Sequence, residues 1–158
     1  MIASPNYVRF VYDGDGSDTP TAGPAGSAEI EDVFNDYFDS IVLAHAPTAF
    51  DGRSDYGPFI ANGVPAGGLF TGAEGIKTAA QAGIYGGTAG VAYDHCYHQA
   101  CDTINNLNHT GFDQMSDAAV TALTQLALLQ GPLASAARAQ ALAHTGVQSD
   151  YRGSLLVR

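Results

Sequence analysis

One short stretch, residues 94–102, holds most of the side chains in this chain that could do chemistry. Its sequence is Asp-His-Cys-Tyr-His-Gln-Ala-Cys-Asp, which combines two thiols, two imidazoles, a phenol and two carboxylates. Imidazoles and carboxylates bind metal ions and transfer protons, and a phenol can donate a hydrogen bond to a developing negative charge. The stretch is therefore the first candidate for a catalytic or metal-binding site.

The two cysteines of the chain, Cys96 and Cys101, are separated by four residues. This spacing differs from the Cys-x-x-Cys of common zinc sites and allows a small disulfide loop instead. Such a bridge would stabilise the fold by roughly 2 kcal/mol and would hold Tyr97 and His98 still between its ends. A histidine beside a tyrosine in a tight loop can also be purely structural, so composition alone leaves both roles open.

The composition is that of an acidic globular chain. Its 158 residues suit one domain or part of one, and 46% hydrophobic residues can supply a core. A formal net charge of −10 makes nucleic acid and anionic membranes poor partners. No apolar run approaches the ~20 residues of a membrane span. No signal peptide opens the chain, yet a disulfide favours an oxidising compartment, and an exported domain without its N-terminal part would reconcile the two.

Strands and helices must position the reactive stretch. Residues 7–12 are β-branched and aromatic and predict a strand, and the glycine- and proline-rich residues 17–27 predict a surface loop. Apolar residues recur with helical spacing from Ile30 to Val42, which predicts a helix with an aromatic stripe facing the core. Ser27 is the expected cap of this helix.

The remaining predicted elements are shorter, except for one helix near the end. We expect strands at 48–50 and 64–70, a short helix from Ser54 or Asp55 to Ala61, a helical turn at 77–82, a polar loop at 103–110, a long helix at 118–129 capped by Ser116, and an Ala-rich helix at 133–143. Strands that alternate with helices are typical of an α/β domain with a mixed sheet.

Five sequence blocks carry a resemblance to a known family. They are residues 52–59, 63–72, 77–81, 86–90 and 96–98. In this order they resemble the secreted two-zinc bacterial aminopeptidases of metallopeptidase family twenty-eight, and most of all the streptomycete leucine aminopeptidase type. The resemblance runs from residue 1 to about residue 129. The family's connection at the position of 17–27 is shorter, so we interpret this loop as an insertion.

The resemblance implies a fold and an activity. Residues 1–130 would form the C-terminal part of a three-layer α/β/α sandwich with a mixed sheet, and residues 131–158 would form a weakly structured, Ala-rich tail. The activity implied is that of a zinc-dependent aminopeptidase, which releases N-terminal, large apolar residues from peptides with a free amino terminus. The implied location is extracellular.

The resemblance also implies roles for individual residues. His98 would bind one of two zinc ions, and Tyr97 would donate a hydrogen bond to the oxyanion that forms during hydrolysis. Arg53 would hold the bound peptide, although an arginine in a glycine-rich loop can equally be a plain surface charge. Gly52 and Phe70 would line an apolar pocket for the first side chain of the substrate, and the alternative for Phe70 is an ordinary core position.

Two carboxylates match a calcium site of the streptomycete type. Asp113 and Asp117 are four residues apart at an expected helix start, where both could bind one hard cation. Negative charge at a helix N-terminus explains them without a metal, and we favour that explanation because the other calcium ligands would lie outside this chain. The family commonly has histidine where Tyr56 stands, but this position is not a metal ligand.

The resemblance leaves the zinc site incomplete. The remaining ligands are a histidine, a bridging aspartate, a glutamate and a further aspartate, and all of them, with the general-base glutamate, are expected upstream of Met1. His98 is then one of five zinc ligands, whereas a catalytic zinc normally has about three protein ligands. We therefore expect a truncated aminopeptidase or, as the alternative, a catalytically inactive fragment or binding module. The inactive fragment could pair with a separate N-terminal segment, and an exposed sheet edge would support that alternative.

Overall fold

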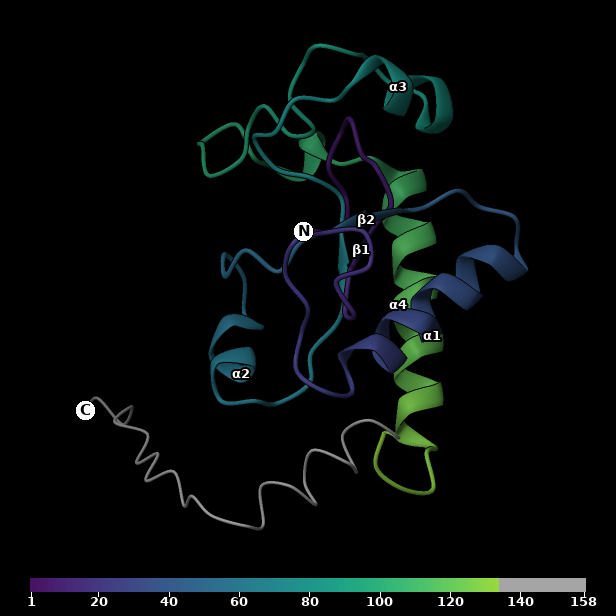
Figure 1. The fold of residues 1–158 in the computed structure, drawn as a ribbon. Coiled ribbons are helices and arrows are strands. Elements are labelled where there is room, and N and C mark those ends of the chain that lie inside the picture. The colour runs from purple at the N-terminus through teal and green to yellow at the C-terminus, as the bar shows by residue number, and fades with distance from the viewer. Residues whose placement is uncertain (134–158) are drawn as a thin grey trace, which may run out of the picture.

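The chain forms a small mixed β-sheet with helices packed against it. The computed structural model describes residues 1–133, which Figure 1 shows as a coloured ribbon. The strands are β1 (Phe10–Tyr12), β2 (Ala46–Thr48) and β3 (Leu69–Phe70), in the order β2-β1-β3. Strand β1 runs parallel to β2 and antiparallel to β3, with Phe10 opposite both Ala46 and Phe70. Helices combined with a mixed sheet confirm the expected α/β class.

Helices of very different lengths connect and follow the strands. Within residues 1–133 they are α1 (Ser27–Ser40), α2 (Gly57–Ala61), α3 (Ala79–Tyr85), the 3₁₀ helix η1 (Ile104–Asn106) and α4 (His109–Ala127). Helices α1 and α4 pack together on one side of the sheet, and α2 lies on the other (Figure 1). None of the described helices is both long enough and apolar enough to span a membrane. The helix predicted at 133–143 lies, apart from its first residue, outside the described residues.

Helix α1 is the helix that the aromatic stripe predicts, with two differences at its ends. It ends at Ser40 because Val42 adopts a left-handed backbone conformation, with φ of 57°. Ile41 and Val42, predicted to face the core, are therefore exposed. At the other end Ser27 is the first helical residue and not a cap, and its hydroxyl accepts a hydrogen bond from the amide of Ala66 (3.0 Å).

The predicted strands are longer than the observed ones. Strand β1 begins at Phe10 and not at residue 7, and β2 covers 46–48 and not 48–50. The largest difference is at 64–70, where only the last two residues pair with β1. A Cβ atom at Gly67 would lie 2.3 Å from Cγ2 of Ile30. This close approach, which only glycine permits, keeps the preceding residues against α1 and out of the sheet.

Helix α4 begins at His109, well before residue 118, where the sequence predicts its start. Its cap is Asn108, whose side-chain oxygen accepts a hydrogen bond from the amide of Gly111 (2.9 Å). Gly111 looked like a loop residue in the sequence, but a Cβ atom there would lie 3.0 Å from the ring of Tyr7. The glycine lets the first turn of the helix approach the N-terminal segment.

The early start of α4 changes the interpretation of several of its residues. Ser116 is inside the helix and caps nothing. Asp113 and Asp117 are exposed in the second and third turns, so their placement at a helix start was wrong, and the helix dipole does not explain them. Val120 and Leu123 are 63% and 68% exposed, so α4 presents an apolar outer face.

The core lies between the sheet and the pair α1–α4. Its buried side chains are Val11, Phe34, Phe38, Met115, Ala118 and Ala122. Side chains alternate along a strand, so Val11 points to these helices while Tyr12 points to the other face of the sheet. There Tyr12 packs against Phe50 and Tyr56, with ring centroids 5.1 and 4.8 Å away.

Truncation of Phe38 tests the assignment of the inner faces of α1 and α4. Phe38 is 0% exposed, so Phe38→Ala should lower the free energy of unfolding by about 3–5 kcal/mol. The exposed Leu123 on the outer face of α4 is the matched control, and Leu123→Ala should change it by no more than about 0.5 kcal/mol. Urea unfolding followed by circular dichroism measures both. Equal losses in the two variants would contradict the assignment.

Candidate active site

The reactive stretch folds into a loop closed by the expected disulfide. The sulfur atoms of Cys96 and Cys101 are 2.04 Å apart, and their Cα atoms are 5.3 Å apart. Cys96 is buried, and its amide donates a hydrogen bond to the carboxylate of Asp94 (2.9 Å). Tyr97 and His98 are thus carried on a closed loop that is anchored at its first cysteine.

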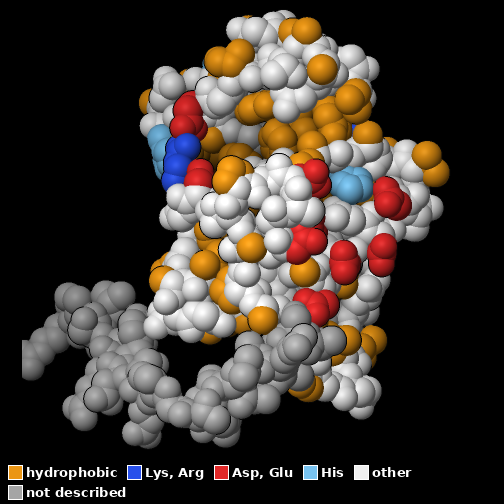
Figure 2. Space-filling view, in the orientation of Figure 1, with side chains coloured by type: hydrophobic (Ala, Val, Ile, Leu, Met, Phe, Trp, Pro, Cys, Tyr) orange, Lys and Arg blue, Asp and Glu red, His pale blue; other side chains and the backbone are white. Residues whose placement is uncertain are grey.

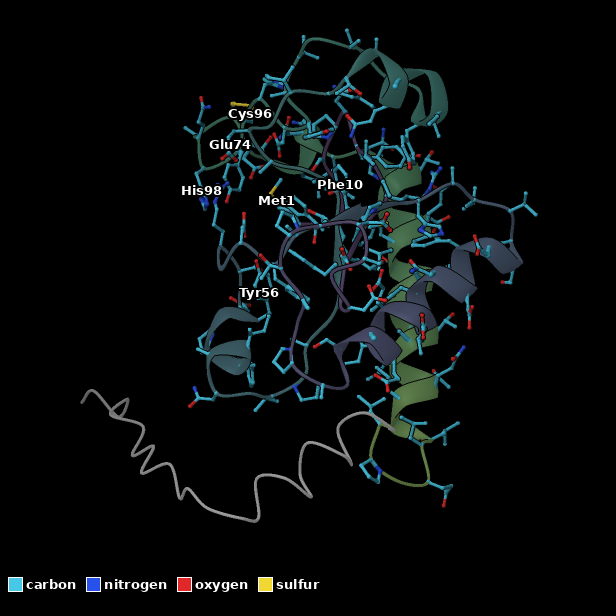
Figure 3. All side chains as sticks on the ribbon, viewed as in Figure 1. Met1, Phe10, Tyr56, Glu74, Cys96 and His98 are labelled. Carbon is cyan, nitrogen blue, oxygen red and sulfur yellow. A yellow bond between two sulfur atoms is a disulfide. The ribbon has the colours of Figure 1, made fainter. Side chains whose placement is uncertain are left out.

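His98 has an unusual backbone conformation for a residue with a side chain. Its φ is 56°, in the left-handed region that glycine usually occupies. Such conformations persist where the surrounding structure enforces them, and they are common at functional sites. The rings of Tyr97 and His98 lie side by side, with centroids 4.0 Å apart and planes tilted by 54°. Figure 3 shows His98 at the same edge of the molecule as Glu74 and Met1.

A pocket of about 300 Å³ lies beside this loop. It is lined by residues from the start of the chain, the segment after β2, strand β3 and the disulfide loop. Four of the predicted site residues line it together: Arg53, Phe70, Tyr97 and His98. Figure 2 shows a histidine, a basic and an acidic side chain next to one another at this edge, with hydrophobic side chains beside them. Residues that are far apart in the sequence therefore meet in one cavity.

Three predicted site residues do not line the pocket. Gly52 does not line the pocket but stands between two residues that do, and its φ of 80° suits a glycine. Asp113 and Asp117 lie on the exposed side of α4 and do not line the pocket. Phe70 is half-buried and stacks on Phe10 with ring centroids 6.0 Å apart, so it serves both the pocket wall and the packing of the sheet.

The turn that carries Arg53 is held by Tyr56, for which the sequence predicted no role as a metal ligand. The Tyr56 hydroxyl accepts hydrogen bonds from the amides of Asp51 and Gly52, both at 2.9 Å. The same hydroxyl donates to the Asp51 carboxylate (2.7 Å), which also accepts from the amide of Arg53 (3.0 Å). A buried aromatic residue just after a glycine-containing turn was the available signal for this role.

These hydrogen bonds change the acidity of Asp51. Burial alone would raise the pKa of its carboxyl group, but the hydrogen bonds from the Arg53 amide and the Tyr56 hydroxyl outweigh burial and hold the pKa below its usual value. Burial and the bond to Asp51 raise the pKa of the Tyr56 phenol. The pocket rim therefore keeps a charged carboxylate beside a neutral phenol.

Arg53 forms an ion pair with an acidic residue that does not line the pocket. Its guanidinium lies 2.7 Å from a carboxylate oxygen of Glu74, and both side chains are more than half exposed. The hydrogen bond and charge of Glu74 raise the pKa of Arg53. Exposed ion pairs add little stability, so the main effect of Glu74 is to orient the guanidinium. Sequence reasoning had no signal for this pairing, because Glu74 lies in another loop.

The described residues do not complete a metal site around His98. An imidazole is a suitable zinc donor, but a catalytic zinc normally needs about three protein ligands. Within residues 1–133, three metal-binding side chains come together at Asp13, Asp15 and Glu31, with ligand atoms within 4.8 Å of one another, and not around His98. The imidazole of His98 is therefore a suitable type of zinc ligand, while the other ligands are not in this part of the chain.

The acidic group at Asp13 has a structural explanation. The Asp13 carboxylate accepts hydrogen bonds from the amides of Gly16, Asp18 and Thr19, at 2.6–3.0 Å, and the last two belong to the loop predicted as an insertion. Glu31 accepts the amide of Gly14 (2.7 Å). Burial would raise the pKa of Asp13, but these hydrogen bonds lower it below the usual value. The group therefore pins the loop that follows β1 onto α1.

Comparisons with known proteins show what this chain is similar to. The profile of peptidase family M28 matches residues 1–123. A "probable leucine aminopeptidase 2" of Aspergillus oryzae is 63% identical over 112 residues, which cover 71% of this chain and 23% of the relative. "Leucine aminopeptidase 2" of Trichophyton rubrum is 58% identical over 108 residues, 68% of this chain and 22% of that protein. The chain thus spans less than a quarter of the length of these curated relatives.

Removal of the Tyr56 hydroxyl tests how the pocket rim is held. In Tyr56→Phe the pKa of Asp51 should rise towards its usual value, because one hydrogen bond to its charged form is lost. A depressed pKa stabilises the fold above the unfolded-state pKa, and this contribution disappears as the pH falls through the folded-state pKa. The variant should therefore be less stable than the unaltered chain at about pH 7, with the difference shrinking towards about pH 3.

Carbon-detected NMR titration of Asp51 and urea unfolding at the two pH values measure these effects. Tyr37→Phe is the matched control, since the Tyr37 ring packs against the core and lies away from the pocket. An unchanged Asp51 pKa in Tyr56→Phe would refute the role of the hydroxyl.

Proposed function

Because this chain belongs to peptidase family M28, we propose that it forms the substrate-binding and oxyanion-stabilising part of a zinc-dependent aminopeptidase. The activity would be release of N-terminal, large apolar residues from peptides. Two relatives that carry the name leucine aminopeptidase 2 support this proposal. The likeness to the streptomycete type remains part of the proposal, since the relatives compared are fungal.

The observation that carries the proposal is the shared pocket of Arg53, Phe70, Tyr97 and His98. His98 would hold one zinc ion, and zinc, when bound, would supply the activated water that hydrolysis needs. The Tyr97 hydroxyl would donate a hydrogen bond to the oxygen of the attacked peptide carbonyl as negative charge develops there. The disulfide loop holds both side chains on the same side, so the two roles are compatible with one substrate position.

The other side of the pocket suits a peptide with an apolar first residue. Phe70, Leu69 and Tyr12 supply an apolar wall, and Gly52 leaves room at the rim. Arg53, oriented by Glu74, would contact the peptide at the pocket mouth and hold it in register with Tyr97. The substrate proposed is therefore a peptide with a free amino terminus and a side chain such as that of leucine.

The position of Met1 supports a source for the missing zinc ligands. Met1 lines the same pocket as His98, and its carbonyl accepts the amide of Thr71 (3.1 Å) just after β3. A carboxylate immediately upstream of Met1 in a longer protein would enter the pocket close to His98. We propose that an N-terminal segment supplies the other ligands of both zinc ions. Calcium binding at Asp113 and Asp117 and an extracellular location belong to the same proposal.

The second candidate is a catalytically inactive fragment or binding module. The observation that favours it is that, within residues 1–133, His98 does not join two further metal-binding side chains. In that case the pocket would bind a peptide end without hydrolysing it, because no activated water is available. The content of bound metal separates the two candidates.

The first test is the zinc content of the purified 158-residue chain after extensive dialysis. With His98 as its single inherited ligand, the chain should retain well below one zinc ion, measured by mass spectrometry of the metal. About two tightly bound zinc ions per chain would contradict an upstream source for the other ligands. That result would mean that this chain completes the metal site by itself.

The second test places this chain where the missing ligands exist. The matching 112 residues of the Aspergillus oryzae relative are replaced by those of this chain, and hydrolysis of leucine amide is measured. Tyr97→Phe in the hybrid should lower kcat by about 10²–10³-fold with little change in KM, because the lost hydrogen bond forms mainly in the transition state.

His95→Ala is the matched control, since His95 is exposed, lies two residues before Tyr97 and does not line the pocket. It should keep normal kcat. A hybrid that binds zinc and turns over normally with Tyr97→Phe would exclude the oxyanion role of Tyr97.

A further inference from the structure

The loop that carries Tyr97 and His98 needs more support than its disulfide gives. The disulfide fixes the distance between Cys96 and Cys101, but it does not fix how the closed loop is oriented against the rest of the fold. Cys101 is exposed, and His98 keeps a left-handed conformation that residues with side chains disfavour. Contacts from outside the disulfide must therefore hold the loop in place.

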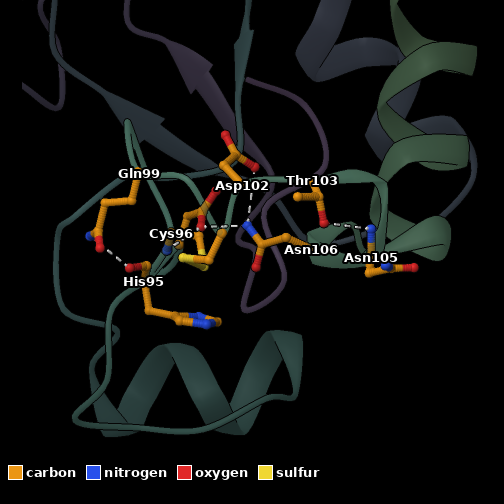
Figure 4. Close-up of a disulfide and its surroundings, with 9 residues drawn as sticks. His95, Cys96, Gln99, Asp102, Thr103, Asn105 and Asn106 are labelled. Carbon is orange, nitrogen blue, oxygen red and sulfur yellow. Dashed lines mark hydrogen bonds between the residues drawn. A yellow bond between two sulfur atoms is a disulfide. The ribbon is translucent and has the colours of Figure 1, made fainter.

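One buried amide side chain reaches both ends of the loop. Nδ2 of Asn106, at the end of the 3₁₀ helix η1, donates to Oδ1 of Asp94 (2.8 Å) and to Oδ1 of Asp102 (3.2 Å). Asp94 precedes Cys96 by two residues, and Asp102 directly follows Cys101. Figure 4 shows Asn106 beside Asp102 and next to Cys96 of the disulfide.

Asp94 connects this bridge to the pocket wall. Asp94 is 4% exposed and Asn106 is 8% exposed, so both groups are shielded from water. The same Oδ1 atom of Asp94 also accepts the amide of Cys96, and the Asp94 amide donates to the carbonyl of Ala73 (2.8 Å). Ala73 is itself a lining residue of the pocket. The bridge therefore ties the loop to the wall that Tyr97 and His98 face.

The 3₁₀ helix holds Asn106 in position. The amide of Asn106 donates to the carbonyl of Thr103 (2.8 Å), and the Thr103 hydroxyl accepts the amide of Asn105 (3.3 Å). A side chain that is already held in position loses less conformational entropy when it forms a hydrogen bond than a mobile side chain does. The side-chain amide of Asn106 is therefore held in position where it can bond both ends of the loop.

We propose that Asn106 is a positioning residue of this site: together with Asp94 and Asp102 it orients the Cys96–Cys101 loop so that Tyr97 and His98 face the pocket. The use that catalysis makes of the two side chains rests on the proposed function. The positioning itself does not, and it can be tested without zinc or substrate.

NMR of the oxidised 158-residue chain compares Asn106→Ala with Asn105→Ala. Asn105 is exposed and its side chain takes no part in the bridge, which makes it the matched control. In Asn106→Ala the Cys96 amide should exchange with solvent at least about tenfold faster, because its acceptor Asp94 is no longer held. His98 should lose the short distance between its amide and Hα protons that a positive φ produces. Amides of α1 and α4 should keep their exchange rates.

Two results would overturn the proposal. One is an Asn106→Ala chain in which the exchange rate of the Cys96 amide and the short distance between the His98 amide and Hα protons are those of the unaltered chain. The other is an unaltered chain in which His98 shows no positive φ. If Asn106→Ala speeds exchange throughout α1 and α4, Asp102→Ala decides, because Asp102 is exposed and its removal takes away one acceptor of Asn106.

Asp102→Ala should speed exchange of the Asp102 and Cys96 amides while α1 and α4 remain protected. No local change in this variant would mean that Asn106 does not bridge the loop. Failure of the zinc or turnover experiments would leave these exchange rates untouched, so the two proposals fail separately.

Discussion

Burial of β1 on both faces is the constraint on which the rest of the structure depends. Phe10, Val11 and Tyr12 are each no more than 9% exposed, so this short strand needs packing partners on both sides. On one side Val11 requires the aromatic stripe of α1 and the inner face of α4. On the other side Phe10 and Tyr12 require Phe70 and a second aromatic cluster. The second requirement helps to build the pocket, because Phe70, which packs against β1, and Tyr12 of β1 itself both line it.

The site itself is made of loops, and specific polar bonds limit their freedom. The turn at Arg53 is held by the Tyr56 hydroxyl, the guanidinium of Arg53 is directed by Glu74, and the loop of His98 is closed by a disulfide. Loops placed by a rigid scaffold are where functional residues usually gather. Each loop here depends on a bond to a group a few residues away or in another loop, which is how a small sheet can position side chains from distant segments.

The sequence predicted those features that depend on local pattern. The helix at α1 followed from apolar spacing, and the pairing of Cys96 with Cys101 followed from their separation and position. The early start of α4 was missed because Gly111 looks like a loop residue until the ring of Tyr7 is placed beside it. The strand at 64–70 was too long because the contact of Gly67 with α1 is tertiary. Secondary-structure propensity and the periodicity of apolar residues carry no information on such contacts between distant segments.

The same limit explains which parts of the site were predictable. Tyr97, His98 and Arg53 stand in blocks that resemble a family, whereas Glu74, Met1 and Asn106 act only through the folded arrangement. A sequence motif can identify residues proposed to contact the substrate. The residues that orient those side chains depend on the tertiary structure, which a motif does not contain. The pocket brings together side chains suited to a peptide and an oxyanion, while the described residues offer one imidazole for a metal. If the proposed function holds, orientation of the peptide and binding of the metal are therefore separable tasks, and the described residues would perform mainly the first.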